Sequence, residues 1–328
     1  MSETIVYSAK KIITMNPSRP EATHVAVRDG RILGAGSLSE LQTWGDVRLD
    51  ERFKDKVLMP GFVEGHAHVM EGSLWSKVYC GWFDRADPDG KLWSGVKSVD
   101  AVVERLRAAE AALEDPAAAV SGWQLDPIYM DNITVTRADL DRVSTTRPVG
   151  VLHASGHIMN VNTKALELAG MMKTGHNHPG IPLGADGLPT GELKGPEVMT
   201  PVGPFVGFER NLLDADEAGL RNFAKLCVRT GTTTITDLAS RMDEDTVDMM
   251  LRVTSEPHYP IRLMPFRFFL GLSAPELVET VLAMKKRATD RLRLGQIKIV
   301  VDGSIQGFSA RLRWPGYHNG APNGLWYI

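Results

Sequence analysis

The chain has 328 residues, of which 43% are hydrophobic and 23% are charged, and its formal net charge is -3. No basic excess is available to neutralise phosphates, so we expect no nucleic-acid partner. No segment approaches the ~20 apolar residues that a membrane helix needs, and the N-terminus lacks a signal-peptide pattern. The two cysteines, Cys80 and Cys227, lie far apart. They exclude a disulfide framework and, with no membrane partner expected, favour a cytoplasmic protein.

The length predicts two or three domains, and the first, at residues 1–58, consists of short strands. Its clearest signal is a pair of alternating runs, 24–28 and 31–34, joined by Asp29-Gly30. Asp-Gly between such runs is typical of a type I′ hairpin, because both central residues need positive φ. We expect a small β-sandwich-like domain here.

The segment 73–213 follows a different pattern and is predicted to be an α+β insertion. A helix is expected over 100–113, a short apolar strand over 149–153, and a helix over 164–169 capped by Asn162 or Thr163. Residues 175–191 are rich in Gly, Pro, Asn and Asp, which indicates a loop.

From residue 214 onward, strands and helices alternate. Helices are predicted at 216–230, 245–254 and from Ser273, where Ser273 and Glu276 form a capping box, and strands at 232–237, 262–269 and 296–301. Repeated strand–helix units indicate parallel strands with right-handed crossovers.

The strand before His66 and His68 fits as the first member of this series. The predicted fold is therefore an α/β, TIM-type (β/α) barrel that is interrupted after its first strand. Residues 59–72 and 214–328 together supply roughly half of the ~250 residues of an eight-stranded barrel. We therefore expect the barrel to be incomplete at the C-terminus, with its second to fourth strands in 214–328.

The stretch 57–68 reads as a buried strand that ends in two histidines. Side chains alternate along a strand, so His66 and His68 leave the backbone on one side, about 6–7 Å apart along it. This spacing lets two imidazoles converge on one metal ion. The alternative is a pair of strand-end histidines that hydrogen-bond to loop carbonyls.

Lys298 lies on the last predicted strand, on the face shared with Gln296, Val300 and Asp302. We expect this side chain to point inward, where an unpaired ammonium would cost several kcal/mol. Ion pairing with Asp302 or Asp237 would satisfy it. Carbamylation by carbon dioxide would equally turn it into an anionic oxygen ligand that bridges two metals.

Two further histidine pairs are candidates for a metal site. His153 and His157 are four residues apart but lack the glutamate of a zincin motif. His176 and His178 form a second His-x-His in a Gly/Pro loop, where no strand fixes their convergence, so a solvated loop is predicted. Tryptophans such as Trp123 could wall an apolar substrate pocket or serve as core residues of the insertion.

The stretch 60–68, with the sequence PGFVEGHAH, resembles the first-strand signature of the amidohydrolase superfamily. More closely, the chain is similar to the amidohydrolase-3 branch, which includes N-substituted formamide deformylases. The matching segments run in order over nearly the whole chain: 120–123, 147–149, 156–160, 165–170, 186–193, 231–234 and 297–304.

The resemblance implies one or two zinc ions held by His66, His68 and Lys298, the last matching a lysine that is carbamylated in binuclear members. It also implies two further histidine ligands and a catalytic aspartate, which would lie beyond residue 328. The candidate substrate-binding residues are His157, Trp123 and Asp302.

The predicted function is hydrolysis of a carbon–nitrogen bond, in a formamide-like, non-peptide amide, by metal-activated water. Two alternatives stay open: the same site acting on esters or lactones, and a non-catalytic, truncated half-barrel remnant. The expected partner is a small-molecule substrate, and a homodimer would help to cover exposed barrel edges.

Overall fold

The computed structural model describes residues 3–131, 133–208, 215–269, 271–303, 305, 310–318 and 324. The chain divides into two compact units, Met1–Val63 and Glu64–Ile328. The boundary lies within five residues of the predicted end of the first domain at residue 58, and the finer domain boundaries stay predictions. None of the helices in these described ranges is both long and apolar enough to cross a membrane.

The first unit contains one four-stranded sheet of order β3-β2-β1-β4. Neighbouring strands pair antiparallel, except that β1 and β4 are parallel. The predicted hairpin is confirmed, because Asp29 and Gly30 both have positive φ, 51° and 72°. The second layer of a β-sandwich stays a prediction. The elements are β1 (Thr4–Ile13), β2 (Glu21–Arg28), β3 (Arg31–Gly36), α1 (Leu38–Leu41), η1 (Gln42–Trp44) and β4 (Val47–Leu58).

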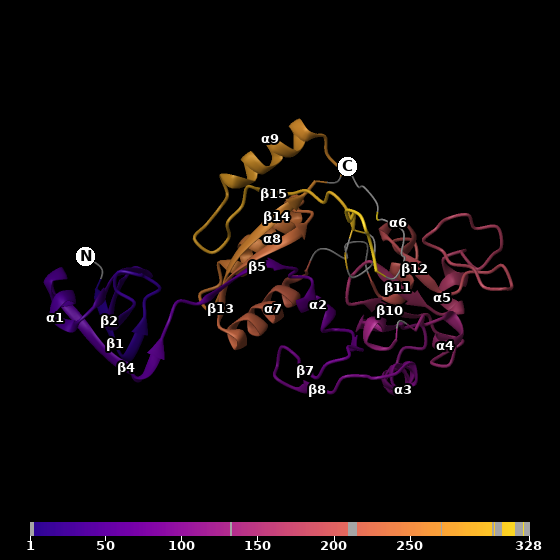
Figure 1. Cartoon of the computed structure of the whole chain (residues 1–328), viewed down its shortest axis with the longest axis horizontal. Coiled ribbons are helices and arrows are strands. Elements are labelled where there is room, and N and C mark those ends of the chain that lie inside the picture. Colours follow the sequence, from indigo (N-terminus) through magenta and orange to yellow (C-terminus); the bar gives the residue numbers. More distant parts are fainter. Residues whose placement is uncertain are drawn as a thin grey trace. The chain divides into compact units, whose positions relative to one another are not determined.

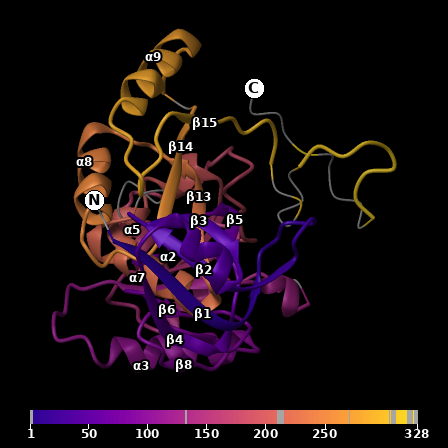
Figure 2. The ribbon, with the colours of Figure 1, turned by 90° about the vertical axis from the view of Figure 1, so that its left-hand side faces the viewer.

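The second unit carries the alternating strands and helices in a sheet of order β15-β14-β13-β5 (Figure 1). Strands β13, β14 and β15 are parallel, as predicted. The helices lie on one side of strand β14 in Figure 2 and share a buried core with the strands. The elements are β5 (Phe62–Ala67), α7 (Glu217–Thr230), β13 (Thr232–Ser240), α8 (Glu244–Thr254), β14 (Arg262–Phe268), α9 (Ala274–Lys285) and β15 (Gln296–Lys298).

Local signals position these helices as expected. Asp216 caps α7, Gly231 ends it with φ of 72°, and Ser273 forms its capping box with Glu276 at the start of α9. The alternating strands and helices confirm a mixed α/β fold. Because the sheet is open over the described residues, the closed barrel stays a prediction.

One sequence expectation about this sheet is wrong. The stretch 57–68 is not one buried strand, because it is interrupted between Leu58 and Phe62. Phe62 and Val63 are 56% and 70% exposed. Strand β5 lies at the edge of its sheet, next to β13, so its apolar side chains receive little cover within the described residues.

The predicted insertion contains a five-stranded sheet of order β12-β11-β10-β9-β6, with a buried cluster of apolar side chains on each side of β9 and β10. Strand β10 has the predicted bounds, and the predicted helices at 100–113 and 164–169 correspond to α3 and α5. The elements are α2 (Glu71–Leu74), β6 (Val78–Tyr79), β7 (Arg85–Ala86), β8 (Leu92–Trp93), α3 (Val99–Glu110), β9 (Val120–Leu125), η2 (Pro127–Tyr129), α4 (Arg137–Asp141), β10 (Val149–His153), β11 (Ile158–Val161), α5 (Thr163–Leu168), β12 (Glu192–Lys194), α6 (Pro196–Met199) and η3 (Gly203–Val206).

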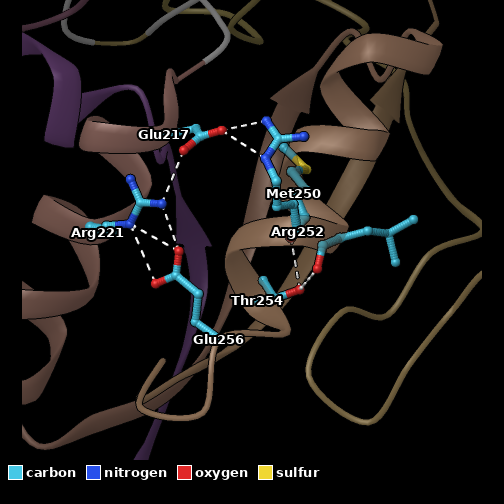
Figure 3. Close-up of polar contacts among 7 residues, drawn as sticks. Glu217, Arg221, Met250, Arg252, Thr254 and Glu256 are labelled. Carbon is cyan, nitrogen blue, oxygen red and sulfur yellow. Dashed lines mark hydrogen bonds and ion pairs between the residues drawn. The ribbon is translucent and has the colours of Figure 1, made fainter.

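A chain of charged side chains joins α7 to the end of α8 (Figure 3). Arg221 Nη2 lies 3.0 Å from Glu217 Oε2 and 2.6 Å from Glu256 Oε1, and Arg252 Nε donates to Glu217 Oε1 at 2.8 Å. The guanidinium groups lower the pKa of both carboxyl groups. Because all four side chains are exposed, the chain orients the helix ends more than it stabilises the fold.

Helix α2 crosses α7 at very close range, directly after the histidine strand. A Cβ on Gly72 would lie 1.9 Å from the Gly219 carbonyl oxygen, and a Cβ on Gly219 would lie 1.9 Å from Ser73 Oγ. The Ser73 hydroxyl donates to Asp216 Oδ1 at 2.9 Å and accepts from the Asp216 backbone N–H at 3.2 Å. The segments that begin and end the insertion, around Ser73 and Asp216, are therefore in direct contact at this crossing.

We expect Gly219→Ala to lower the free energy of unfolding of the second unit by about 1–3 kcal/mol, because the added methyl group overpacks the α2–α7 contact. Chemical denaturation followed by circular dichroism measures this change. Gly65→Ala is the matched control, since a Cβ there meets no described atom within 4 Å. Equal stability of the two variants would contradict the close crossing.

Candidate metal centre

His66 and His68 stand together at the carboxyl end of β5. Their ring centroids are 5.4 Å apart, and the ring planes meet at 78°. The backbone N–H of His66 donates to Glu64 Oε1 at 2.9 Å, which ties this carboxylate to the strand end. The alternation of side chains along the strand therefore brings the two imidazoles onto one side, as the sequence predicts.

The surroundings of His66 favour its neutral imidazole. Burial lowers the pKa of His66, and positive charge on His68 and on Lys298 lowers it further. Neutral imidazole is the form that binds metal. Strand β15, which carries Lys298, and strand β5 lie at opposite edges of the sheet, and Lys298 as a metal ligand stays a prediction.

Asp237 provides a buried carboxylate beside the pair. Its Oδ1 lies 3.8 Å from Nδ1 of His68, and the residue is 0% exposed on β13. At 3.8 Å the contact is too long for a hydrogen bond, so Asp237 is a charged neighbour of the His68 ring. From the sequence, Asp237 is predicted only as an ion-pair partner of Lys298.

The donors fit a divalent metal through their chemistry. Two imidazoles at one strand end are typical ligands of zinc and similar ions. Over the described residues, no three His, Cys, Asp or Glu side chains gather closely enough to hold a metal. Lys298 in a modified, anionic form stays the predicted third donor.

A cavity of about 410 Å³ opens beside the histidine pair, between the parallel sheet and the sheet of the insertion. Its aromatic wall is Trp123, which is 1% exposed and meets Trp75 edge-on at 5.1 Å. Arg85 lies 5.9 Å from the Trp123 ring centroid and donates to Glu71 Oε1 at 2.6 Å. An apolar wall with a few fixed charges is typical of a small-molecule site.

The candidate substrate-binding residues have different positions. Trp123 lines the cavity, whereas His157 and Asp302 are absent from its lining over the described residues. Burial lowers the pKa of His157, and positive charge on His68 adds to this effect. Asp302 Oδ2 accepts from the Arg311 backbone N–H at 2.8 Å. Their roles in substrate binding stay predictions.

Sequence reasoning missed three residues that line the cavity, namely Glu71, Arg85 and His153. The position of His153 at the end of an apolar strand was the available signal, but only the zincin spacing was considered. The second His-x-His behaves as expected: His176 Nε2 lies 2.8 Å from the Met171 carbonyl oxygen, and His178 Nδ1 accepts from the Gly180 N–H at 3.0 Å. Both bind loop backbone.

The fold is shared with two solved structures of archaeal proteins. A metal-dependent hydrolase from Pyrococcus horikoshii OT3 superposes with a TM-score of 0.65 and 15% identity, covering 99% of this chain and 60% of its own. One from Pyrococcus furiosus superposes with a TM-score of 0.61 and 17% identity, covering 99% and 62%. At this identity the likeness establishes the fold.

Residues 54–321 match the amidohydrolase family model, and the chain belongs to this family. It is 27% identical to Protein LONG AFTER FAR-RED 3 of Arabidopsis thaliana over 91% of this chain, and 27% identical to the putative amidohydrolase YtcJ of Bacillus subtilis (strain 168) over 96%. The chain spans 50% and 57% of the lengths of these two relatives. The predicted family and branch are confirmed.

We expect His153 to make the stability of the protein depend on pH. Burial lowers the pKa of His153 in the folded state, whereas the unfolded side chain titrates near ~6.5. The unfolded chain therefore binds more protons as pH falls through this value, and the stability associated with neutral His153 is lost. Between pH 7 and pH 5, the free energy of unfolding should fall more steeply for the wild type than for His153→Gln. Parallel slopes in urea titrations at several pH values would contradict this assignment.

Proposed function

We propose that the protein hydrolyses a carbon–nitrogen bond of a small, formamide-like amide, with a divalent metal ion, zinc in the first instance, held by His66, His68 and Lys298. The observation that carries this proposal is the pair of strand-end imidazoles, one of them held neutral by its surroundings, beside a cavity with an aromatic wall. Membership of the amidohydrolase family and the metal-dependent hydrolases that share the fold support it.

Each described residue has a defined task in this proposal. When bound, a divalent ion supplies Lewis-acid chemistry, because it lowers the pKa of water towards ~7 and polarises a carbonyl group. His66 and His68 hold the ion through ring nitrogens, and Asp237 is a charged neighbour of His68. Trp123 shields an apolar substituent of the substrate from water. The activity is proposed for the whole protein, because the chain spans 50% and 57% of the lengths of its two relatives.

Removing either imidazole should remove activity. We expect His66→Ala and His68→Ala, each made in the full-length protein, to lower kcat/KM by about 10²–10³-fold. The reason is that a metal ion acting as a Lewis acid lowers the activation barrier by several kcal/mol, and each variant removes one of its ligands. Metal content, measured by mass spectrometry after dialysis, should fall in parallel. His176→Ala is the control, because it removes a histidine of the second His-x-His that contacts the Met171 backbone carbonyl.

Full activity and full metal content in both variants would exclude this metal centre. Equal turnover of an amide and its matching ester would instead favour the broader hydrolase that the sequence leaves open. Weak metal binding without turnover of any substrate would favour a non-catalytic remnant, because two histidines and a lysine alone should hold zinc weakly. Tight, near-stoichiometric metal binding would count against the remnant.

Lys298 tests the third ligand separately. As a carbamate it should give a carbonyl signal in the ¹³C NMR spectrum of protein equilibrated with ¹³C-bicarbonate and metal. The signal should disappear in Lys298→Met and persist in Lys286→Met, which alters the exposed C-cap lysine of α9. A spectrum that is the same in both variants would leave Lys298 as an ion-pair partner.

A further inference from the structure

We propose that His153 determines the substrate specificity of this site by accepting, at Nδ1, a hydrogen bond from an N–H group of the substrate. The site would then take a secondary amide in preference to a tertiary amide or an ester. This inference rests on the proposed hydrolytic function and names the class of substrate within it.

His153 is a buried polar residue with one side in the cavity. It is the last residue of β10, is 8% exposed, and contributes to the cavity lining together with Trp123 and His68. Its Nε2 is bonded to Asn160 Oδ1 on the neighbouring strand β11. Within the described part of the chain, its Nδ1 has no hydrogen-bond partner.

The protein itself fixes which ring nitrogen carries the proton. Asn160 is 0% exposed, and its Nδ2 donates to the Val135 carbonyl oxygen at 2.6 Å. Because a carbonyl oxygen can only accept, the amide group of Asn160 must turn its oxygen towards His153. An amide oxygen also only accepts, so Nε2 of His153 must be the donor. In the neutral ring Nδ1 is then a bare acceptor.

The surroundings keep the ring neutral. Burial lowers the pKa of His153 and outweighs the hydrogen bond to Asn160 and the negative charge of Glu192, which raise it. The positive charge of Lys194 acts in the same direction as burial. A buried acceptor held in one tautomer selects for a donor on whatever occupies the cavity.

Two carboxylate oxygens on the cavity wall already have partners. Glu64 Oε1 accepts from the His66 backbone N–H, and Glu71 Oε1 accepts from Arg85. A secondary amide supplies the missing donor through its N–H. Its N-methyl analogue and the matching ester fill similar space but would leave Nδ1 buried and unsatisfied, at an expected loss of about 10- to 100-fold in affinity.

The test compares three probes of one shape: N-benzylformamide, N-benzyl-N-methylformamide and benzyl formate. Their dissociation constants are measured by ligand-observed NMR on the full-length protein carrying His66→Ala and His68→Ala, which should bind without turnover. We expect N-benzylformamide to bind about 10- to 100-fold more tightly than the other two. His153→Gln, added to this background, should abolish the preference, because a glutamine amide replaces Nε2 and leaves nothing at Nδ1.

His153→Asn is the matched control, since the asparagine amide stands close to the position of Nδ1 and can still accept. It should retain part of the preference for the secondary amide. The quantity compared is a ratio of affinities within one variant, so a partial loss of folded protein does not alter it. Long-range ¹H–¹⁵N spectra of histidine-labelled protein report the tautomer directly and should show Nε2–H at His153.

Four results would overturn the inference. They are an Nδ1–H tautomer, equal binding of the three probes to the His66→Ala, His68→Ala protein that retains His153, undetectable binding of all three, and an unchanged preference in His153→Gln. Hydrolysis assays on the intact metal-loaded protein separate this from the proposed function. Selective binding with no turnover of any probe would reject the hydrolytic function and support the role of His153. Turnover with the same amide-to-ester ratio in wild type and His153→Gln would reject the role of His153 and support the function.

Discussion

The site depends on the contact in which α2 crosses α7. Gly72 and Gly219 let the two backbones approach within a distance that no side chain would permit, and Ser73 and Asp216 exchange hydrogen bonds across 143 residues of sequence. The insertion leaves the parallel sheet and returns to it at this contact. Its sheet therefore faces the end of β5, and side chains from two distant parts of the chain line one cavity.

Desolvation favours the neutral form of the imidazoles in and near this cavity. Burial is the largest cause of the lowered pKa of His66, His153 and His157, so the three imidazoles near or in the cavity all favour the neutral form. Neutral rings can bind a metal or accept a hydrogen bond, whereas protonated rings can do neither. Asp237 lies 3.8 Å from His68, and Asn160 is hydrogen-bonded to His153, so the two rings have different polar neighbours.

Local chemistry in the sequence predicted much of the second unit. The Asp216 cap, the Gly231 end of α7 and the capping box of Ser273 are confirmed, because such signals act over a few residues and tertiary contacts seldom override them. The expectation of a buried strand at 57–68 failed for the opposite reason. Apolar residues indicate a strand, but its burial depends on neighbours far along the chain, and β5 lies at an edge.

By itself, the sequence determined the family, the alternation of strands and helices, and the pairing of His66 with His68, because side-chain alternation along one strand is a local property. Only the tertiary structure decided which residues share the cavity. Trp123, Arg85 and His153 reach it through strand pairing and helix packing over long sequence separations. The tautomer of His153 likewise follows from a chain of hydrogen bonds through Asn160 to Val135, which no spacing in the sequence encodes.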